Sequence, residues 1–143
     1  MSYSVDANLL IYASDTSCSH HIKAQEFLRG AAESNELLFL AYPTIMAFLR
    51  ISTHPGVFKS PLTPARAQSI GELTALPQIR IIGEEPGFLD VFREVTESLS
   101  VRGNAVHDAH LASILRQHGV RVLYTNDRDF RRFEFLTVRN PLE

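Results

Sequence analysis

The stretch SYSVDANLLIY, residues 2–12, indicates the fold at the very start of the chain. Ser2–Val5 has the composition of a short buried strand, and Asp6 follows it directly. A turn and a helical segment over residues 9–12 come next. A strand that leads straight into a helix is the first unit of an alternating α/β chain. The stretch therefore predicts a sheet strand with a carboxylate at its carboxyl end.

Strand and helix patterns alternate along the rest of the chain. Helical periodicity and end signals predict helices at residues 20–32, from Pro43, and at 64–76, 86–99, 105–118 and 127–132. Apolar or β-branched runs predict strands at residues 36–42, 79–82, 120–124 and 136–138. This order predicts an α/β fold in one domain, residues 1–143, with a mostly parallel central sheet and helices on both faces.

The helix over residues 105–118 carries signals at both of its ends. Asn104 is a residue type that commonly caps a helix N-terminus with its side chain. Gly119 is the residue type that most often follows a helix C-terminus. We expect both residues to fill these roles.

Composition limits the class of protein. A chain of 143 residues with 45% hydrophobic content is long enough to bury an ordinary core. Cys18 is the single cysteine, so no internal disulfide is expected, and no secretion signal or membrane-spanning run is recognisable. These features predict a cytoplasmic protein. The net charge of −2 does not favour nucleic-acid binding, although a bound divalent cation would supply positive charge to a phosphate.

Three aspartates that are remote in sequence are expected to meet. Asp6 and Asp127 each come just after a predicted strand, at the carboxyl edge of the sheet. Asp108 lies near the N-terminus of a helix that must run back against the strands, so that end lies at the same edge. Clustered carboxylates repel unless a cation neutralises them. Mg²⁺ prefers such oxygen ligands and promotes phosphodiester hydrolysis.

Each acid also has an ordinary structural explanation. Asp6 is a common residue in turns, and Asp108 is favourable near a helix N-terminus. Asp127 is suited to cap the short helix after it, and Asp129 to pair with Arg132 at three-residue spacing. None of these explanations predicts that the acids converge, so convergence decides between the two interpretations.

Three segments of the chain carry motifs around these aspartates: VDANLLIY at 5–12, VHDAHLA at 106–112 and TNDRDF at 125–130. They resemble motifs of the PIN-domain family, in particular the VapC-type toxins of type II toxin–antitoxin systems. The resemblance implies a Mg²⁺- or Mn²⁺-dependent endoribonuclease, a VapB-like antitoxin and a homodimer. It places Asp6, Asp108 and Asp127 at the metal site and Asp129 in an accessory position. Asn8 and Thr125 fall on positions whose side chains orient those carboxylates.

One position departs from this pattern. Family members often carry a glutamate on the helix after the second strand, where this chain has Ala47. The departure leaves open an alternative, a catalytically weak or inactive PIN-like domain that binds RNA or protein. Candidate contacts to RNA phosphates are Arg50, Arg128 and Arg131, although each is also typical of a solvated surface.

Other interpretations have weaker support. A phosphoacceptor receiver and a haloacid-dehalogenase-like phosphatase also place aspartates at strand ends, but the latter expects an aspartate where Asn8 stands. The histidines and Cys18 have no zinc-binding spacing. Phe27, Phe48 and Phe58 are candidates for a dimer seam or antitoxin groove, with burial in the core as the more common role of aromatic residues.

Overall fold

A computed structural model describes residues 2–143 and contains a five-stranded sheet in which all neighbouring strands are parallel. The strands lie in the order β3-β2-β1-β4-β5. Their bounds are β1 Ser2–Val5, β2 Leu37–Ala41, β3 Ile79–Ile82, β4 Val122–Tyr124 and β5 Thr137–Arg139. The predicted α/β class is confirmed, and the described sheet is wholly rather than mostly parallel.

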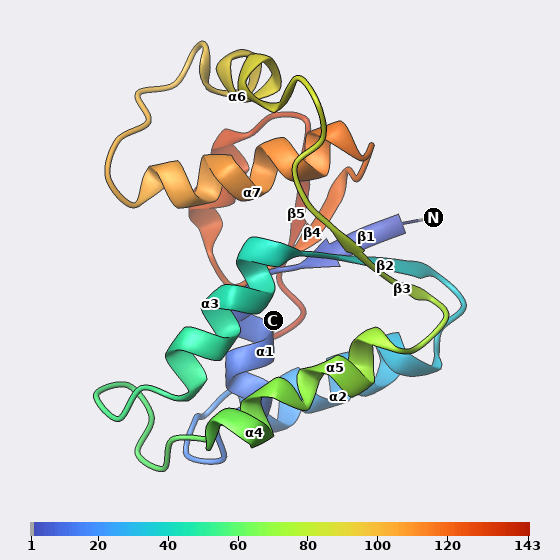
Figure 1. Cartoon of the computed structure of the whole chain (residues 1–143), viewed down its shortest axis with the longest axis vertical. Helices are drawn as coiled ribbons and strands as arrows, with labels where there is room; N and C mark the ends of the chain where they lie inside the picture. Colours follow the sequence, from blue (N-terminus) through green and yellow to red (C-terminus); the bar gives the residue numbers. More distant parts are fainter. Residues whose placement is uncertain (1) are drawn as a thin grey trace.

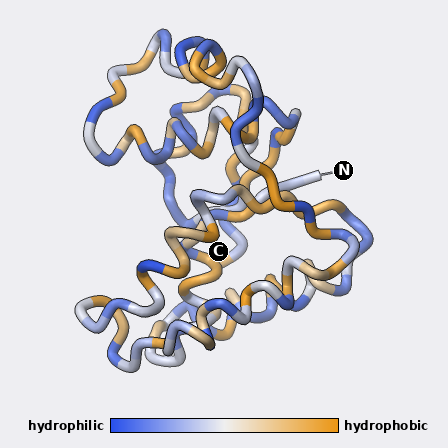
Figure 2. The backbone as a smooth tube through the Cα atoms, in the orientation of Figure 1, coloured by the Kyte–Doolittle hydropathy of each residue, from blue (hydrophilic) through white to orange (hydrophobic). Residues whose placement is uncertain are grey.

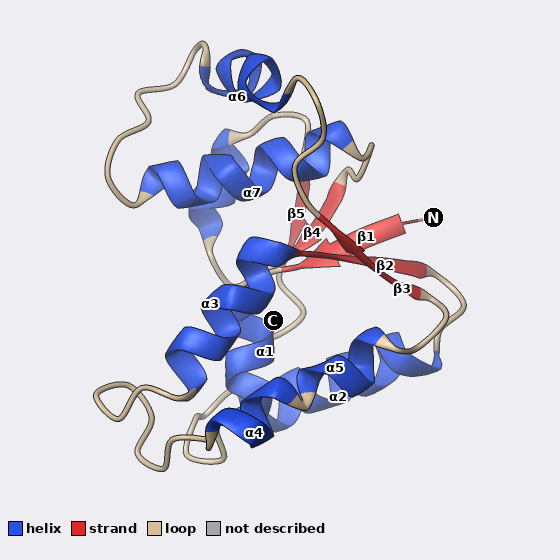
Figure 3. Cartoon of the chain, in the orientation of Figure 1, coloured by secondary structure: helices blue, strands red, loops and turns tan. Residues whose placement is uncertain are grey.

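Helices connect the strands and cover both faces of the sheet (Figure 1). Their bounds are α1 Ala7–Ser14, α2 His21–Glu33, α3 Tyr42–Ser52, α4 Pro64–Gln68, α5 Ile70–Thr74, α6 Phe88–Thr96, α7 Ala105–Gln117 and the 3₁₀ helix η1 Arg128–Arg132. Helices α6 and α7 lie on one side of the sheet, and α1, α2, α4 and α5 lie on the other (Figure 3). This gives the three-layer arrangement that the alternating pattern predicted.

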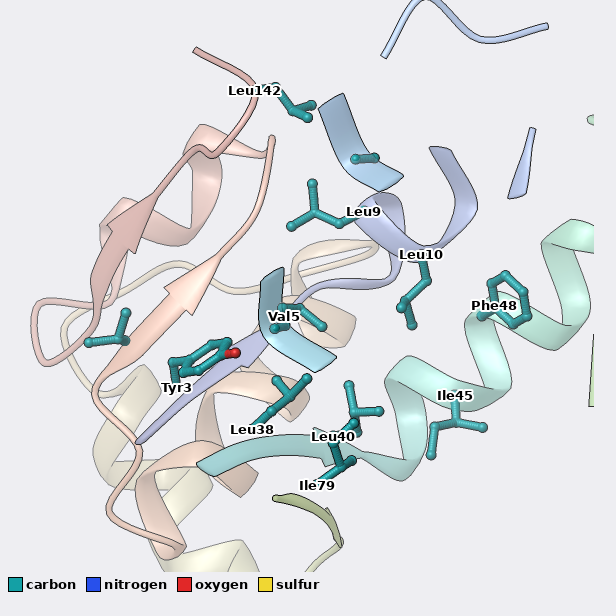
Figure 4. Close-up of a cluster of buried hydrophobic side chains, with 13 residues drawn as sticks. Tyr3, Val5, Leu9, Leu10, Leu38, Leu40, Ile45, Phe48, Ile79 and Leu142 are labelled. Carbon is teal, nitrogen blue, oxygen red and sulfur yellow. The ribbon is translucent and has the colours of Figure 1, made fainter. Parts of the chain in front are cut away.

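The alternation of side chains along the strands divides the core into two layers. Tyr3 and Val5 of β1 pack with α1, α2 and α3 in the cluster shown in Figure 4. Leu123 of β4 points to the opposite face and packs against Ile114 and Leu115 of α7. Successive residues of a strand face opposite sides of a sheet, so β2, β3 and β4 contribute to both layers. Figure 2 shows the hydrophobic colour along much of β2 and β3.

The aromatic residues proposed for an interface mostly belong to this core. Phe48 and Phe58 are buried, and Phe27 packs partly buried with its ring 4.8 Å from that of Tyr124. Burial, the more common role of such residues, is therefore the correct interpretation for Phe48 and Phe58.

Two predicted elements differ from the structure. The helix expected over residues 64–76 is divided into α4 and α5 at Ser69. The Ser69 hydroxyl donates to the carbonyl of Arg66 at 2.5 Å, the kind of local bond by which serine competes with regular helical bonding. The strand expected from residue 120 begins at Val122, because the Val120 N–H donates to the carbonyl of Leu115 and closes helix α7.

The two predicted ends of α7 have different outcomes. Gly119 follows the helix with φ +69°, a left-handed conformation that glycine adopts without strain, as predicted. Asn104 is the N-terminal flanking residue, but its side chain makes no capping hydrogen bond. Its backbone is helical, with φ −63° and ψ −23°, whereas a capping side chain generally needs an extended backbone. The predicted side-chain cap is therefore wrong.

No helix within residues 2–143 is both long and apolar enough to span a membrane.

Candidate metal centre

The order of the strands creates a switch point beside β1. From β1 the chain builds outward through β2 to β3, and it then crosses over to β4 on the other side of β1. The crossover carries α6 and α7. Ligands of open parallel sheets bind at the carboxyl ends of strands at such a point. Asp6 directly follows β1, and Thr125 and Asp127 follow β4, so these residues lie at the switch point.

Three carboxylates come close together there. Asp108 of α7, and Asp127 and Asp129 at the start of η1, each present an oxygen within 4.8 Å of the others. Asp108 and Asp127 are partly buried, and Asp129 is exposed. The predicted convergence of Asp108 with Asp127 is therefore present. The accessory acid Asp129 joins this closest set, and Asp6 lies beside it.

Asp6 is held by a hydrogen-bond network from two strand ends. One carboxylate oxygen accepts the Ala7 N–H at 2.7 Å, and the other accepts the Thr125 hydroxyl at 2.7 Å. The Thr125 oxygen also accepts the Asn8 side-chain amide at 3.2 Å and the Asp127 N–H at 3.0 Å. Because Thr125 accepts two donors, its one proton is directed to Asp6. Thr125 therefore holds the Asp6 carboxylate directly, and Asn8 acts on it only through Thr125.

The ordinary roles considered for the acids are also present. Asp6 accepts the first amide of α1, and an Asp127 oxygen accepts the Asp129 N–H at 2.9 Å at the start of η1. Asp129 pairs with Arg132, with 3.5 Å between carboxylate oxygen and guanidinium nitrogen. Each carboxylate has about four lone-pair sites, so one such contact leaves oxygen positions free for another ligand.

Burial and mutual repulsion raise the pKa of two of the acids, Asp108 and Asp6. Partial burial, followed by the charges of Asp127 and Asp6, raises the pKa of Asp108 to about 6. Burial also raises the pKa of Asp6 above its ordinary value, against the lowering effect of its bonds from Thr125 and Ala7. The negative charge of Asp127 adds to this rise. Nearby carboxylates that disfavour each other's ionisation are the electrostatic setting that a cation relieves.

A cavity of about 180 Å³ adjoins the acids between α3 and α7. Asp6 and Asp108 line it on one side, and α3 contributes Thr44, Ala47 and Arg50. The predicted RNA contact Arg50 therefore lies next to the acids. Arg128 and Arg131 line a much smaller recess beside Asp127, away from α3, together with Asn126 and Asn140.

Comparison with known proteins assigns the family. The model of the PIN domain matches residues 3–136. The chain is 36% identical to Ribonuclease VapC48 of Mycobacterium tuberculosis, across 99% of the chain and 98% of that protein. Ribonuclease VapC37 of the same organism is 30% identical, across 96% and 95% of the two proteins. The chain is a PIN-domain protein of the VapC family.

Solved structures of PIN-domain toxins share the fold. The structure of Mycobacterium tuberculosis VapC20, described as a Sarcin-Ricin loop cleaving toxin, superposes with a TM-score of 0.69 at 17% identity, and covers 96% of this chain and 98% of that one. VapBC2 of Rickettsia felis, bound to a fragment of promoter DNA, superposes with a TM-score of 0.68 at 22% identity, and the match covers 98% of both chains. At these sequence identities the superposition shows a shared fold and nothing more about function.

The acids of this PIN domain fit a hard divalent cation. The donors are carboxylate oxygens, which are the ligands that Mg²⁺ and Mn²⁺ prefer, and they meet within the span of one ion's ligand shell. Burial and the charges of Asp127 and Asp6 raise the pKa of Asp108, and a bound cation would favour its charged form.

The sequence did not reveal one part of the PIN-domain site, the cavity beside Ala47. Thr44 and the face of α7 that carries His107 and His110 line this cavity. The three-residue spacing of Thr44, Ala47 and Arg50 on one helix was the available signal, since residues three apart are neighbours on a helix surface.

Proposed function

We propose that this VapC-family chain is a divalent-metal-dependent endoribonuclease, the toxin of a type II toxin–antitoxin pair. The observation that carries the proposal is the meeting of Asp108, Asp127 and Asp129 beside Asp6 at the carboxyl edge of the sheet. The relatives named as VapC ribonucleases match nearly the whole chain and support RNA as the substrate. Residues 1–143 then form a single PIN domain.

The residues around the site have different proposed roles. Asp108, Asp127 and Asp129 would hold Mg²⁺ or Mn²⁺, with Asp6 completing the acidic rim. An ion held by these residues would supply Lewis-acid activation of a phosphate oxygen and of water. Thr125 holds the Asp6 carboxylate in one orientation through its 2.7 Å hydrogen bond. Arg50 on one side of the acids and Arg128 and Arg131 on the other are placed to attract the RNA backbone.

The partners follow from the same family assignment. We propose a VapB-like antitoxin that neutralises the activity, a homodimeric toxin, and action on RNA in the cytoplasm. The structures of VapBC2 from Rickettsia felis and of VapBC-1 from nontypeable Haemophilus influenzae support a partner of this class for proteins of this fold.

Ala47 favours one competing function, a PIN domain that binds RNA without cutting it. Because position 47 carries alanine, the cavity wall beside Asp6 and Asp108 lacks the carboxylate that family members often have there. Under this alternative the purified protein binds RNA but leaves it intact with every divalent metal tested.

One experiment separates the two functions. Purified protein is incubated with total cellular RNA, with Mn²⁺ or with EDTA, and the new RNA ends are mapped. We expect defined cuts that need Mn²⁺ and disappear in the Asp6→Asn variant. Asp90→Asn is the matched control, because Asp90 is 78% exposed on α6. Equal cutting by Asp6→Asn and wild type would contradict the proposed site, and intact RNA in all samples would favour the binding-only function.

A further inference from the structure

The cavity between α3 and α7 has features that the metal centre does not use. It holds about 180 Å³ beside Asp6 and Asp108, and its α3 wall consists of Pro43, Thr44, Ala47 and Arg50. Ala47 is half-buried and contributes only a methyl group to that wall. The space that a longer side chain at this position would occupy is therefore open.

The α3 side of the cavity offers groups that attract an anion. Helix α3 begins at Tyr42, and its flanking residue Ala41 supplies no side-chain acceptor to the first free amides. The N-terminus of a helix carries a partial positive charge. Arg50 lies two turns further along the same face, is exposed, and makes no ion pair with any residue in the described part of the chain.

A buried hydroxyl provides an independent observation. The Thr44 side chain is 3% exposed and lines the cavity, and its oxygen has no hydrogen-bond partner among residues 2–143. A buried polar atom without a protein partner is costly, so such an atom generally binds a ligand or an ordered water.

We propose that this cavity binds the RNA phosphate adjacent to the one that is cut, through Arg50 and the Thr44 hydroxyl, and that Ala47 makes room for it. The inference rests on the proposed ribonuclease function and adds a substrate position to it. Asp6 and Asp108 line one side of the cavity and favour a cation there, whereas Arg50 on the α3 side favours an anion, so the proposed phosphate lies against α3.

The substitution Ala47→Glu distinguishes these two ligands. A glutamate at 47 lies three residues before Arg50 on α3, a spacing at which the two side chains would pair on the helix surface. The pair would neutralise Arg50 and fill the cavity. A phosphate subsite would then be lost, whereas a site for a second metal ion would gain the acid that it lacks.

The test measures RNA binding and RNA cleavage separately with the full chain. A fluorescent single-stranded RNA is titrated with protein in EDTA at several salt concentrations, and cleavage of the same RNA is followed with Mn²⁺. The variants are Arg50→Gln, Thr44→Val, Ala47→Glu and the neutral counterpart Ala47→Gln. Arg29→Gln is the charge control. Arg29 is exposed on α2, and this helix precedes the amino end of β2, the opposite end of the strand from the acidic site.

The proposal predicts a specific pattern. Arg50→Gln weakens binding by about tenfold and lowers the slope of log affinity against log salt by about 0.7, the value for one lost phosphate contact on a single strand. Thr44→Val weakens binding about threefold without lowering the thermal midpoint, because it removes a hydroxyl that has no protein partner. Ala47→Glu weakens binding more than Ala47→Gln does, and Arg29→Gln binds like wild type.

Other results would overturn the inference. Faster Mn²⁺-dependent cleavage by Ala47→Glu, with RNA affinity in EDTA unchanged, would identify the cavity as a second cation position. If the wild type cuts RNA, and Arg50→Gln and Thr44→Val bind and cut it equally well, the phosphate subsite is rejected. The proposed ribonuclease function would still stand. A wild-type protein that neither binds nor cuts RNA would reject both, and the two failures are thus distinguishable.

Discussion

Replacement of Asp108 by asparagine should stabilise the metal-free protein at alkaline pH. In the native state, partial burial and the nearby Asp127 and Asp6 raise the pKa of Asp108 to about 6 from an ordinary 3.8. A carboxyl group with a raised native pKa contributes its full stabilisation below pH 4, and this is lost as the pH rises through about 6. Asparagine resembles the protonated form and cannot ionise. The variant therefore begins to gain stability relative to wild type above about pH 4, and the gain is complete just above pH 6.

The size of this effect follows from the shift in the Asp108 pKa. A rise from 3.8 to about 6 corresponds to roughly 3 kcal/mol for a group shielded from water. Asp108 is only partly buried, so solvent screening reduces the expected gain to about 1 kcal/mol. For a domain near 150 residues this is a rise of about 2–4 °C in the thermal midpoint.

Bound metal should make wild type more stable than the Asp108→Asn variant, the reverse of their order without metal. At a Mn²⁺ concentration near 100 times its dissociation constant, bound ion adds about 2.7 kcal/mol to the stability of wild type. The Asp108→Asn variant lacks one charged ligand and gains much less. Thermal unfolding followed by circular dichroism at pH 5 and pH 8, with EDTA or Mn²⁺, measures all four conditions. Equal midpoints at pH 8 in EDTA, or equal stabilisation of both proteins by Mn²⁺, would refute the reasoning.

Further predictions concern the residues that hold the site and the fold in place. Thr125→Val removes the hydroxyl shared by Asp6, Asn8 and Asp127 and should cost about 1–3 kcal/mol in urea unfolding, with a large fall in cleavage rate; unchanged stability would contradict the network. Leu115→Ala removes a fully buried side chain of α7 and should cost about 2–5 kcal/mol by the same measurement. Gly119→Ala forces an alanine to φ +69° and should cost about 1–2 kcal/mol, and a loss much below 0.5 kcal/mol would show that the turn relaxes.

The arrangement of the site could be predicted from sequence where a single geometric rule governs it. Asp6 and Asp127 follow parallel strands, and Asp108 lies at the start of a helix that runs back against them, so they were expected at one sheet edge. The structure places them there. The closest set, however, includes Asp129. This depends on how η1 turns after Asp127, a local conformation that strand and helix periodicity does not specify.

Other features could not be predicted from sequence, because they depend on local hydrogen bonds or on tertiary packing. Residues 64–76 have helical periodicity, yet Ser69 donates to the Arg66 carbonyl and divides the helix. Asn104 has a suitable residue type for capping, but its helical backbone prevents that role. The cavity beside Ala47 lies between α3 and α7, two helices far apart in sequence that both contact β2. Such tertiary packing cannot be deduced from one sequence.

Anomalous diffraction from crystals grown with MnCl₂ tests the central claim most directly. The account predicts a strong anomalous peak within bonding distance of carboxylate oxygens from Asp108, Asp127 and Asp129, and loss of that peak in Asp127→Asn crystals. A protein that cuts RNA in solution, yet shows no peak between these carboxylates at saturating Mn²⁺, would contradict it.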